Sequence, residues 1–157
     1  MTRLRGRAPR GQRLLAKAPH GHWRTTTMIS SVRLDGSTAC MTIEGATDTA
    51  VFHAYVREIL CPQLRAGDLV IMDNLAPHKH DPTLALITAV GAGVRFLPAY
   101  SPDLNPIEMM WSKVKALLRA AEARTAEELQ GAIAAALKRV SAQDAAGWFA
   151  ACGYSII

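Results

Sequence analysis

The sequence predicts an α/β domain in which a mixed β-sheet is covered by helices, and three observations carry this prediction. A segment rich in Thr, Ile and Val ends at the hairpin dipeptide Asp35-Gly36. Two short, continuously apolar runs, 69–72 and 94–97, have the composition of buried strands and are separated by a segment of helical length. Apolar residues at helical spacing then dominate the sequence from residue 107 onward.

Size and composition are those of one soluble domain spanning 1–157. The chain has 157 residues, of which 50% are hydrophobic and 20% charged, so it can bury a core and is not expected to be disordered. The longest nearly apolar run, 84–94, is too short to span a membrane, and the start lacks a signal-peptide pattern. Three scattered cysteines form no C-x-x-C pair, which argues against a disulfide framework or a cysteine zinc site. We therefore expect a cytoplasmic protein without a membrane partner.

The net charge of +5 is concentrated in an N-terminal arm, residues 1–24. This arm contains seven basic and no acidic side chains, so subtracting it from the totals leaves 11 basic against 13 acidic residues. A basic arm interrupted by Gly and Pro is typical of contact with the phosphate backbone of nucleic acid. A solvated chain end explains the charge equally well. The candidate DNA-binding residues of the arm are Arg3, Arg5, Arg7, Arg10 and Arg13.

A hairpin and an amphipathic helix are expected first in the chain. The two hairpin strands are predicted at 25–34 and 38–43, on either side of the Asp-Gly turn. Thr47 can cap the helix that follows, and Pro62 limits it. One face of this helix is apolar at helical spacing. Its residues are Phe52, Tyr55, Val56, Ile59 and Leu60.

A strand–helix–strand unit is expected next. The run 69–72 is predicted to be a strand buried on both faces, followed by a helix over about 82–90 and a second buried strand at 94–97. A crossover of this length predicts that the two strands are parallel neighbours.

The rest of the chain is predicted to be helical. After a proline-rich loop, a helix is expected over 107–118. Thr125 with Glu128 has the spacing of a capping box that opens a further helix, and Ser141 with Asp144 is expected to start a last short helix.

Two acidic residues stand where α/β sheets bind their ligands. Asp73 directly follows the run 69–72, at the carboxyl end of a strand. Glu108 lies in the first turn of the helix after the next strand, so both side chains are expected at one edge of the sheet. Structural explanations compete with a functional one. Asp73 suits an Asx turn, and Glu108 suits the third position of a capping box that begins at Asn105.

Polar residues around the two acids favour a functional site. Clustered carboxylate oxygens suit Mg²⁺ or Mn²⁺, and a pair of such ions stabilises the attacking and leaving oxygens in phosphoryl transfer. We therefore expect Asp73 and Glu108 to be catalytic and metal-binding. The neighbouring polar residues would contact DNA or support the metal ligands, although His78 is equally well explained as a satisfied loop histidine. These residues are Asn74, His78, Lys79 and Asn105.

Two motifs around these acids resemble DDE transposases. Residues 73–79 read Asp-Asn-Leu-Ala-Pro-His-Lys, and residues 97–108 read Leu-Pro-Ala-Tyr-Ser-Pro-Asp-Leu-Asn-Pro-Ile-Glu. Residues 111–115, Trp-Ser-Lys-Val-Lys, continue the likeness, and the hairpin and residues 8–12 match more weakly. The interval of 34 residues between the two acids also resembles that of the family. The group that the chain most resembles is the bacterial insertion sequences related to mariner, the insertion sequence 630 group.

The resemblance implies a ribonuclease-H-like fold and DNA cleavage plus strand transfer with two divalent metal ions, Mg²⁺ or Mn²⁺. Asp73 matches the second acid of the family's triad, and Glu108 matches the third. In the family, the first acid belongs to an initial strand that precedes the segment matched here by residues 8–12. That first strand and its Asp are therefore expected to be missing, as is the family's N-terminal helix-turn-helix region.

Two functions remain open at this point. The chain is either a transposase catalytic domain, incomplete on its own, or a non-catalytic truncated remnant that binds DNA or full-length transposase. The first function requires transposon ends and target DNA as partners, and completion by an upstream-frame segment or a homodimer. No other early acid replaces the absent one, because Asp35 lies in a turn and Glu44 and Asp48 follow the second strand.

Overall fold

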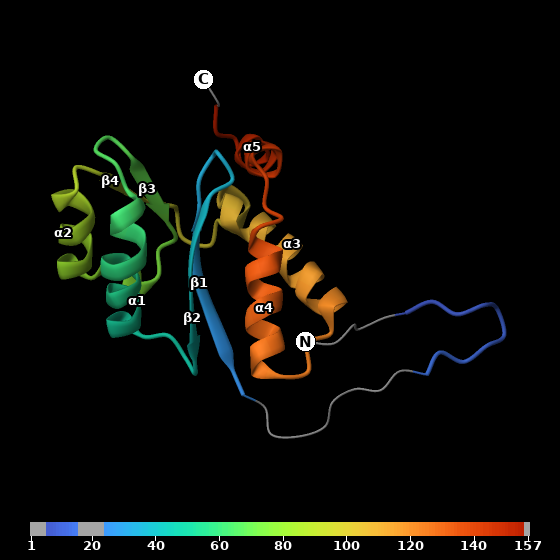
Figure 1. Ribbon diagram of the computed structural model, residues 1–157. Helices are drawn as coiled ribbons and strands as arrows, with labels where there is room; N and C mark the ends of the chain where they lie inside the picture. The colour runs from blue at the N-terminus through green and yellow to red at the C-terminus, as the bar shows by residue number, and fades with distance from the viewer. Residues whose placement is uncertain (1–5, 16–23, 156–157) are drawn as a thin grey trace.

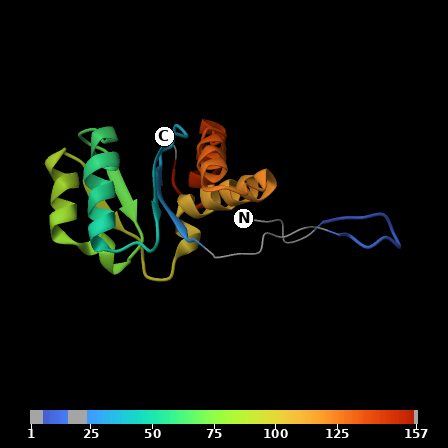
Figure 2. The same ribbon diagram turned by 60° about the horizontal axis from the view of Figure 1, so that its bottom comes forward.

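The computed structural model describes residues 6–15 and 24–155 (Figure 1). Its body consists of a β-hairpin, a helical segment, a β–α–β unit and three further helices. Figures 1 and 2 show the hairpin between two groups of helices, with α1 and α2 on one side and α3 and α4 on the other. The predicted α/β class is confirmed, and the arrangement is compatible with a ribonuclease-H-like domain.

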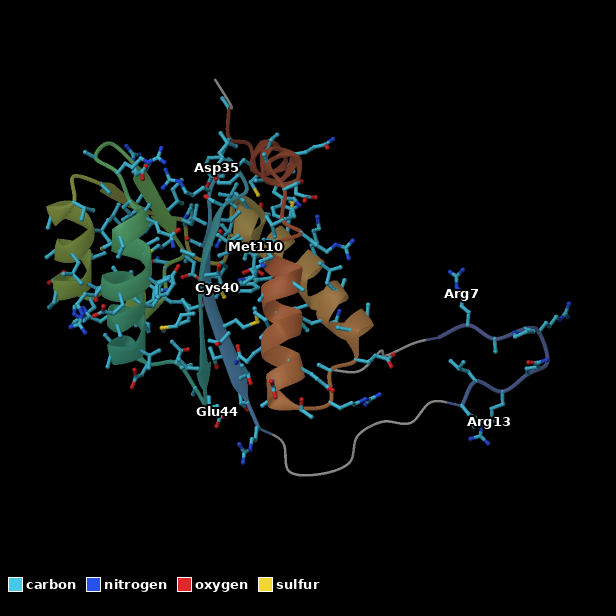
Figure 3. The ribbon with its side chains drawn as sticks, in the orientation of Figure 1. Arg7, Arg13, Asp35, Cys40, Glu44 and Met110 are labelled. Carbon is cyan, nitrogen blue, oxygen red and sulfur yellow. The ribbon has the colours of Figure 1, made fainter. Side chains whose placement is uncertain are left out.

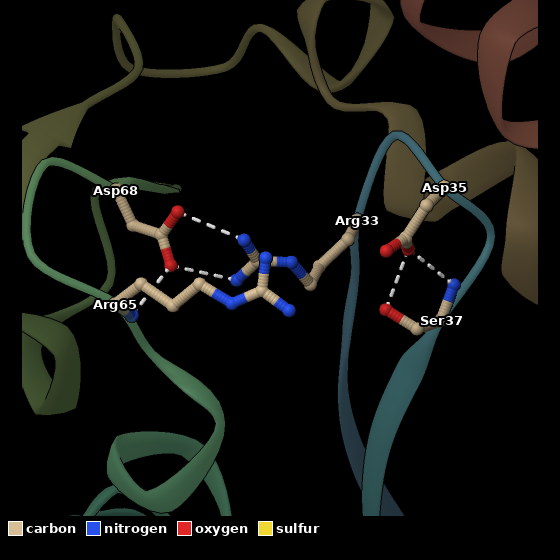
Figure 4. Close-up of polar contacts among 5 residues, drawn as sticks. All are labelled: Arg33, Asp35, Ser37, Arg65 and Asp68. Atoms are coloured by element: carbon tan, nitrogen blue, oxygen red, sulfur yellow. Dashed lines mark hydrogen bonds and ion pairs between the residues drawn. The ribbon is translucent and has the colours of Figure 1, made fainter.

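The hairpin consists of β1 (Thr26–Val32) and β2 (Thr38–Glu44), which pair antiparallel along their full length. Asp35 fixes the predicted turn. Its carboxylate accepts hydrogen bonds from the backbone N–H of Ser37 at 2.8 Å and from the hydroxyl of the same residue at 2.6 Å (Figure 4). These local contacts lower the pKa of Asp35.

The first helical segment is longer than one α-helix. α1 (Thr49–Tyr55) continues directly into a π-helix (Val56–Leu60) and a 3₁₀ turn (Cys61–Gln63). The cap is Asp48 and not Thr47, because the Asp48 carboxylate accepts the backbone N–H three residues later at 2.8 Å. The predicted apolar face of this segment is confirmed. Its buried side chains are Phe52, Tyr55, Val56 and Leu60.

The predicted crossover is formed by β3 (Leu69–Met72), α2 (Asp81–Ala89) and β4 (Gly93–Phe96), and the two strands are parallel. The prediction that both strands are buried on both faces is wrong. Only Met72 of β3 is buried, while Leu69 is 53% exposed. Within the described residues each strand has a neighbouring strand on one edge only, so fewer side chains cover the faces of β3 and β4 than in a wider sheet.

The C-terminal half contains α3 (Pro106–Ala121), α4 (Ala126–Leu137) and α5 (Ala142–Ala151). The predicted capping box that opens α4 is confirmed, and the expected short helix that starts at Ser141 and Asp144 is α5, which also opens with a capping box. An ion pair between Lys113 Nζ and Asp144 Oδ2, 2.5 Å apart, joins α3 to α5.

The hydrophobic core is divided into two clusters. Tyr55 and Ile87 belong to the first, which lies among α1, α2 and β3. Met110 and Val114 belong to the second, which lies between α3 and α4. β1 contributes side chains to both clusters, because neighbouring residues of a strand point to opposite faces.

The strands form two pairs and not one continuous sheet. Among the described residues, β1 pairs only with β2 and β3 pairs only with β4. The sheet directions are mixed, as predicted, but no described strand lies between β1 and β3. The three cysteines are free, and none of the helices in the described residues is long and apolar enough to cross a membrane.

Candidate active site

Asp73 follows β3 directly, and two contacts orient its carboxylate. His78 Nδ1 lies 2.6 Å from Oδ1, and the backbone N–H of Leu75 donates to the same oxygen at 3.3 Å. The second contact is the Asx turn of the structural explanation. Both contacts use Oδ1. Oδ2 accepts no hydrogen bond from the described residues, and the Asp73 side chain is 44% exposed.

His78 is held between Asp73 and α1. Its ring packs against the ring of Phe52 with 4.4 Å between centroids. A carboxylate can only accept hydrogen bonds, so the nitrogen facing an ionised Asp73 carries the proton. His78 therefore orients Asp73, and a buried aromatic side chain fixes the position of His78 itself.

Glu108 lies in the first turn of α3. Asn105 occupies the N-cap position, but its side chain makes no capping hydrogen bond. The contact between the two residues is through the backbone, from the Glu108 N–H to the Asn105 carbonyl at 3.1 Å. No hydrogen bond or ion pair to the Glu108 carboxylate occurs among the described residues, so the capping-box explanation for Glu108 is wrong.

The loop between β4 and α3 is shaped by two tyrosines. Tyr154, beyond α5, donates its hydroxyl hydrogen bond to the Leu104 carbonyl at 2.9 Å and so anchors the loop. Tyr100 has a φ of 59°, which is unusual for a residue other than Gly, and its side chain is fully exposed. The anchored part of the loop leads directly into the turn that carries Glu108.

Asp73 and Glu108 line the same cavity, of about 320 Å³, together with Asn74 and Asn105. A larger groove of about 550 Å³ also reaches Asp73, Asn105 and Glu108, and His78 lines this groove. Lys79 is exposed and lines neither cavity. The structure thus brings five of the six predicted polar residues to one region and leaves Lys79 outside it.

The basic arm is described only in part. Arg3 and Arg5 lie outside the described residues. In the segment 6–15, Arg7, Arg10 and Arg13 are exposed, and Figure 3 shows this segment extending away from the body.

Each of the other early acids has a partner among the described residues. Asp35 fixes the hairpin turn, Asp48 caps α1, and Glu44 lies 3.7 Å from Arg24. Among the described residues, no group of three His, Cys, Asp or Glu side chains is arranged to hold a metal ion. Asp73 and Glu108 therefore stand as a pair of carboxylates.

Asp73 and Glu108 provide some, but not all, of the ligands that a hard divalent cation requires. Free carboxylate oxygens of both residues face a cavity with room for water, and Mg²⁺ and Mn²⁺ prefer oxygen ligands and retain several waters. Two carboxylates alone leave most coordination positions to water, which predicts weak binding.

The sequence patterns did not reveal an ion pair at the other end of β3. Arg33 Nη1 and Nη2 each lie 2.8 Å from an oxygen of Asp68, and the backbone N–H of Arg65 donates to the same carboxylate at 2.8 Å (Figure 4). These contacts, with the Arg33 hydrogen bonds first, lower the pKa of Asp68 to about 2. The partners are 35 residues apart, so no local spacing could have indicated the pair.

Comparison with known families agrees with the motifs at this site. A model of the DDE superfamily endonucleases matches residues 1–130, a range that includes Asp73 and Glu108. No curated protein matches the chain. The matched family consists of transposase-type nucleases that act on DNA and generally use divalent metal ions. Because the match covers well over half of the sequence, the chain belongs to the DDE superfamily endonucleases.

Proposed function

We propose that the chain is the catalytic region of a transposase related to mariner, of the insertion sequence 630 group, which cuts DNA and transfers strands with Mg²⁺ or Mn²⁺. The observation that carries the proposal is the position of Asp73 and Glu108 on the wall of one cavity. Both acids belong to the motifs that resemble this group. Asp73 Oδ2 and both carboxylate oxygens of Glu108 accept no hydrogen bond from the described residues.

The protein residues have separable tasks in this proposal. A bound divalent ion would supply charge neutralisation at the reacting phosphate. Asp73 and Glu108 would hold it, and His78 keeps one oxygen of Asp73 fixed so that the other remains available. Asn74 and Asn105 offer amide donors to phosphate oxygens from the wall of the same cavity.

DNA would also be held by positive charge outside the cavity. Arg7, Arg10 and Arg13 are exposed, and Lys79 is exposed close to the strand ends. Such side chains gain affinity by releasing counterions from the phosphate backbone, with little preference for sequence. Arg3 and Arg5 would extend this contact.

The metal site would be completed from elsewhere. Two carboxylates provide a weak site, and a further segment of transposase or a second copy of the chain would supply the remaining ligand and the contacts to the element's ends. The alternative function is a non-catalytic protein that binds DNA or full-length transposase, and a test of metal binding separates the two.

The test is a Mn²⁺ titration of the full chain followed by NMR line broadening. We expect broadening centred on Asp73, Asn74 and Glu108, at millimolar rather than micromolar Mn²⁺, because water fills most coordination positions. Asp73→Asn and Glu108→Gln should each reduce the broadening. Glu127→Gln, which removes an exposed acid from α4, is the matched control and should leave it unchanged.

The proposal fails if the double variant broadens as the wild type does. Broadening that is spread over all exposed acids would also contradict it, because the cavity would then have no advantage over the surface.

A further inference from the structure

The end of α5 holds Tyr154 in a fixed position. The helix ends in a Schellman motif, in which Gly153 has a φ of 84° and donates its N–H to the Ala150 carbonyl at 3.0 Å. The Tyr154 N–H donates to the Phe149 carbonyl, also at 3.0 Å. The rings of Phe149 and Tyr154 pack edge to face with 5.5 Å between centroids, which is the apolar contact that accompanies this motif. Local sequence thus fixes the direction in which Tyr154 leaves the helix.

The Tyr154 hydroxyl reaches the loop between β4 and α3, where it donates to the Leu104 carbonyl at 2.9 Å. Leu104 directly precedes Asn105, the N-cap of α3, so its carbonyl lies outside the hydrogen-bond ladder of that helix. Burial, followed by the nearby Cys152, raises the pKa of Tyr154, so the hydroxyl keeps its proton and remains a donor at neutral pH. Among the described residues, no other hydrogen bond joins the loop 98–105 to a distant part of the chain.

The loop 98–105 forms much of the cavity at the candidate site. Most of its residues line that cavity together with Asp73 and Glu108. Its conformation includes Tyr100 with a φ of 59°, which is unfavourable for a residue with a Cβ and persists only where surrounding contacts fix it. The remaining hydrogen bonds of the loop are short-range, such as that from the Asn105 N–H to a carbonyl three residues earlier at 3.0 Å. The loop therefore depends on a contact from outside, and Tyr154 supplies one.

α5 is itself attached to the body at its other end. Asp144 Oδ2 lies 2.5 Å from Lys113 Nζ, which joins the start of α5 to the middle of α3. The hairpin turn at Gly36 also packs against the backbone of Ser141, next to α5 (Figure 1). Because α3 and the loop before it are both attached to α5, a displacement of the loop relative to α3 would break a contact at one end of α5.

We propose that Tyr154 is a positioning residue for the candidate site: its hydroxyl holds the loop 98–105 and the first turn of α3 where Glu108 and Asp73 can bind one divalent ion. The proposal rests on the proposed function of the two acids and adds a residue to it. Tyr154 acts through the Leu104 main chain and not by contact with the acids. It also lies outside the motifs in which Asp73 and Glu108 occur.

The first test is hydrogen exchange of the full chain by NMR, without metal or DNA. Tyr154→Phe removes the hydroxyl and keeps the ring. We expect the Asn105 N–H to exchange about two- to tenfold faster in this variant, which is the change that the loss of one neutral hydrogen bond produces. Thr125→Val is the matched control, because it removes a hydroxyl that caps α4, and it should leave the exchange of Asn105 unchanged.

A second variant changes the position of the tyrosine without removing any of its atoms. Gly153→Ala is strained by its φ of 84°, whereas the added carbon has no neighbour within 4 Å, so its effect is confined to the helix end. It should also speed the exchange of Asn105. Gly147→Ala, inside α5 and equally free of contacts, is its control and should not. Urea unfolding verifies that each variant folds, and if Tyr154→Phe does not, Gly153→Ala decides.

The second test measures the consequence for the site. Mn²⁺ is titrated at a temperature at which every variant is fully folded, so that a loss of stability alone cannot change the dissociation constant. Tyr154→Phe should raise the dissociation constant for Mn²⁺ at Asp73 and Glu108 by about two- to tenfold. Thr125→Val should leave it at the wild-type value.

The outcomes separate this proposal from the proposed function. Unchanged exchange of Asn105 in both Tyr154→Phe and Gly153→Ala would show that the hydroxyl does not hold the loop, and would overturn the proposal. Faster exchange with an unchanged Mn²⁺ constant would also overturn it, while centred broadening in the wild type would leave the proposed function intact. If the wild type itself shows no broadening centred on Asp73 and Glu108, the proposed function fails, and the positioning role fails with it.

Discussion

Arg33 and Asp68 join the end of β1 to the start of β3 through a bidentate ion pair, with both nitrogen–oxygen distances at 2.8 Å. β1 and β3 share no backbone hydrogen bond among the described residues, so this side-chain contact links the two strand pairs directly. Bidentate arginine–carboxylate pairs are stronger and more specific in geometry than single contacts. The pair therefore helps to set the distance between the two strand pairs at one end of the larger groove, which has a volume of about 550 Å³.

Asp68→Asn should lower stability in a pH-dependent way. The folded pKa of Asp68 is about 2, below the value of about 3.9 for an unfolded chain, so its contribution is present above about pH 4 and is lost as the pH falls toward 2. Allowing for partial solvent exposure, we expect the variant to lose about 1–2 kcal/mol at pH 7. Urea unfolding at pH 7 and pH 2.5 checks this, with Glu127→Gln as control. An equal loss of stability at both pH values would contradict the lowered pKa of Asp68.

Lys113 shows how a motif residue receives a structural role. It belongs to the Trp-Ser-Lys-Val-Lys stretch, yet its ammonium group contacts Asp144 at the start of α5. Lys113, followed by the Ser141 contacts, lowers the pKa of Asp144 to about 2. Lys113→Met should therefore raise the pKa of Asp144 and cost about 1 kcal/mol of stability. An NMR titration of the carboxylate measures the first effect, and Lys115→Met is the control. An unchanged Asp144 pKa would disprove the coupling.

The elements that sequence patterns predicted well are those governed by local chemistry. The Asp-Gly turn, the capping box of α4 and the parallel crossover depend on residues a few positions apart or on chain handedness. Contacts between residues far apart in the sequence were not predictable. The Gly36 turn packs so closely on α5 that a Cβ would lie 2.6 Å from the backbone of Ser141 and Ala142, and no local pattern contains that contact.

The placement of Asp73 and Glu108 on one cavity was predictable for a similar reason. Asp73 follows a strand and Glu108 opens a helix, so topology alone placed both near one edge. Their local contacts were not predictable. The expected capping box at Glu108 does not form, and the orientation of Asp73 by His78 depends on Phe52, a residue of another element. The prediction that β3 is buried on both faces was wrong because it assumed a neighbouring strand on each edge of β3.

Tyr100 should contribute to DNA binding and not to stability. Its side chain is fully exposed beside the cavity that holds Asp73 and Glu108, and its φ of 59° is costly for a residue with a Cβ. Tyr100→Gly should leave stability unchanged or raise it by up to about 1 kcal/mol. Stacking of an aromatic ring on a base is worth about 1–3 kcal/mol, so Tyr100→Ala should weaken binding of single-stranded DNA by about tenfold. Tyr100→Phe is the control; wild-type affinity of Tyr100→Ala would remove the stacking role.

The basic arm should determine the salt dependence of DNA binding. Each phosphate contact adds about 0.9 to the slope of log K against log salt, so replacing Arg7, Arg10 and Arg13 by Ala should reduce the slope by up to about 3. Fluorescence anisotropy with a random duplex at several salt concentrations measures it. Replacing Lys138 and Arg139, at the end of α4, is the matched control. An unchanged slope, or strong preference for terminal-repeat DNA, would show that the arm does not act by counterion release.

Residues 1–157 alone should cleave DNA poorly. Phosphoryl transfer depends on metal position and charge neutralisation, and a displacement of about 1 Å can cost about 100-fold in rate. Asp73 and Glu108 lack a third acidic or histidine partner among the described residues. We therefore expect Mn²⁺-dependent nicking of a labelled duplex by the full chain to be slow, and Asp73→Asn to reduce what remains, with Glu127→Gln as the control. Rapid cleavage that is lost in Asp73→Asn would mean that another residue of the chain completes the site.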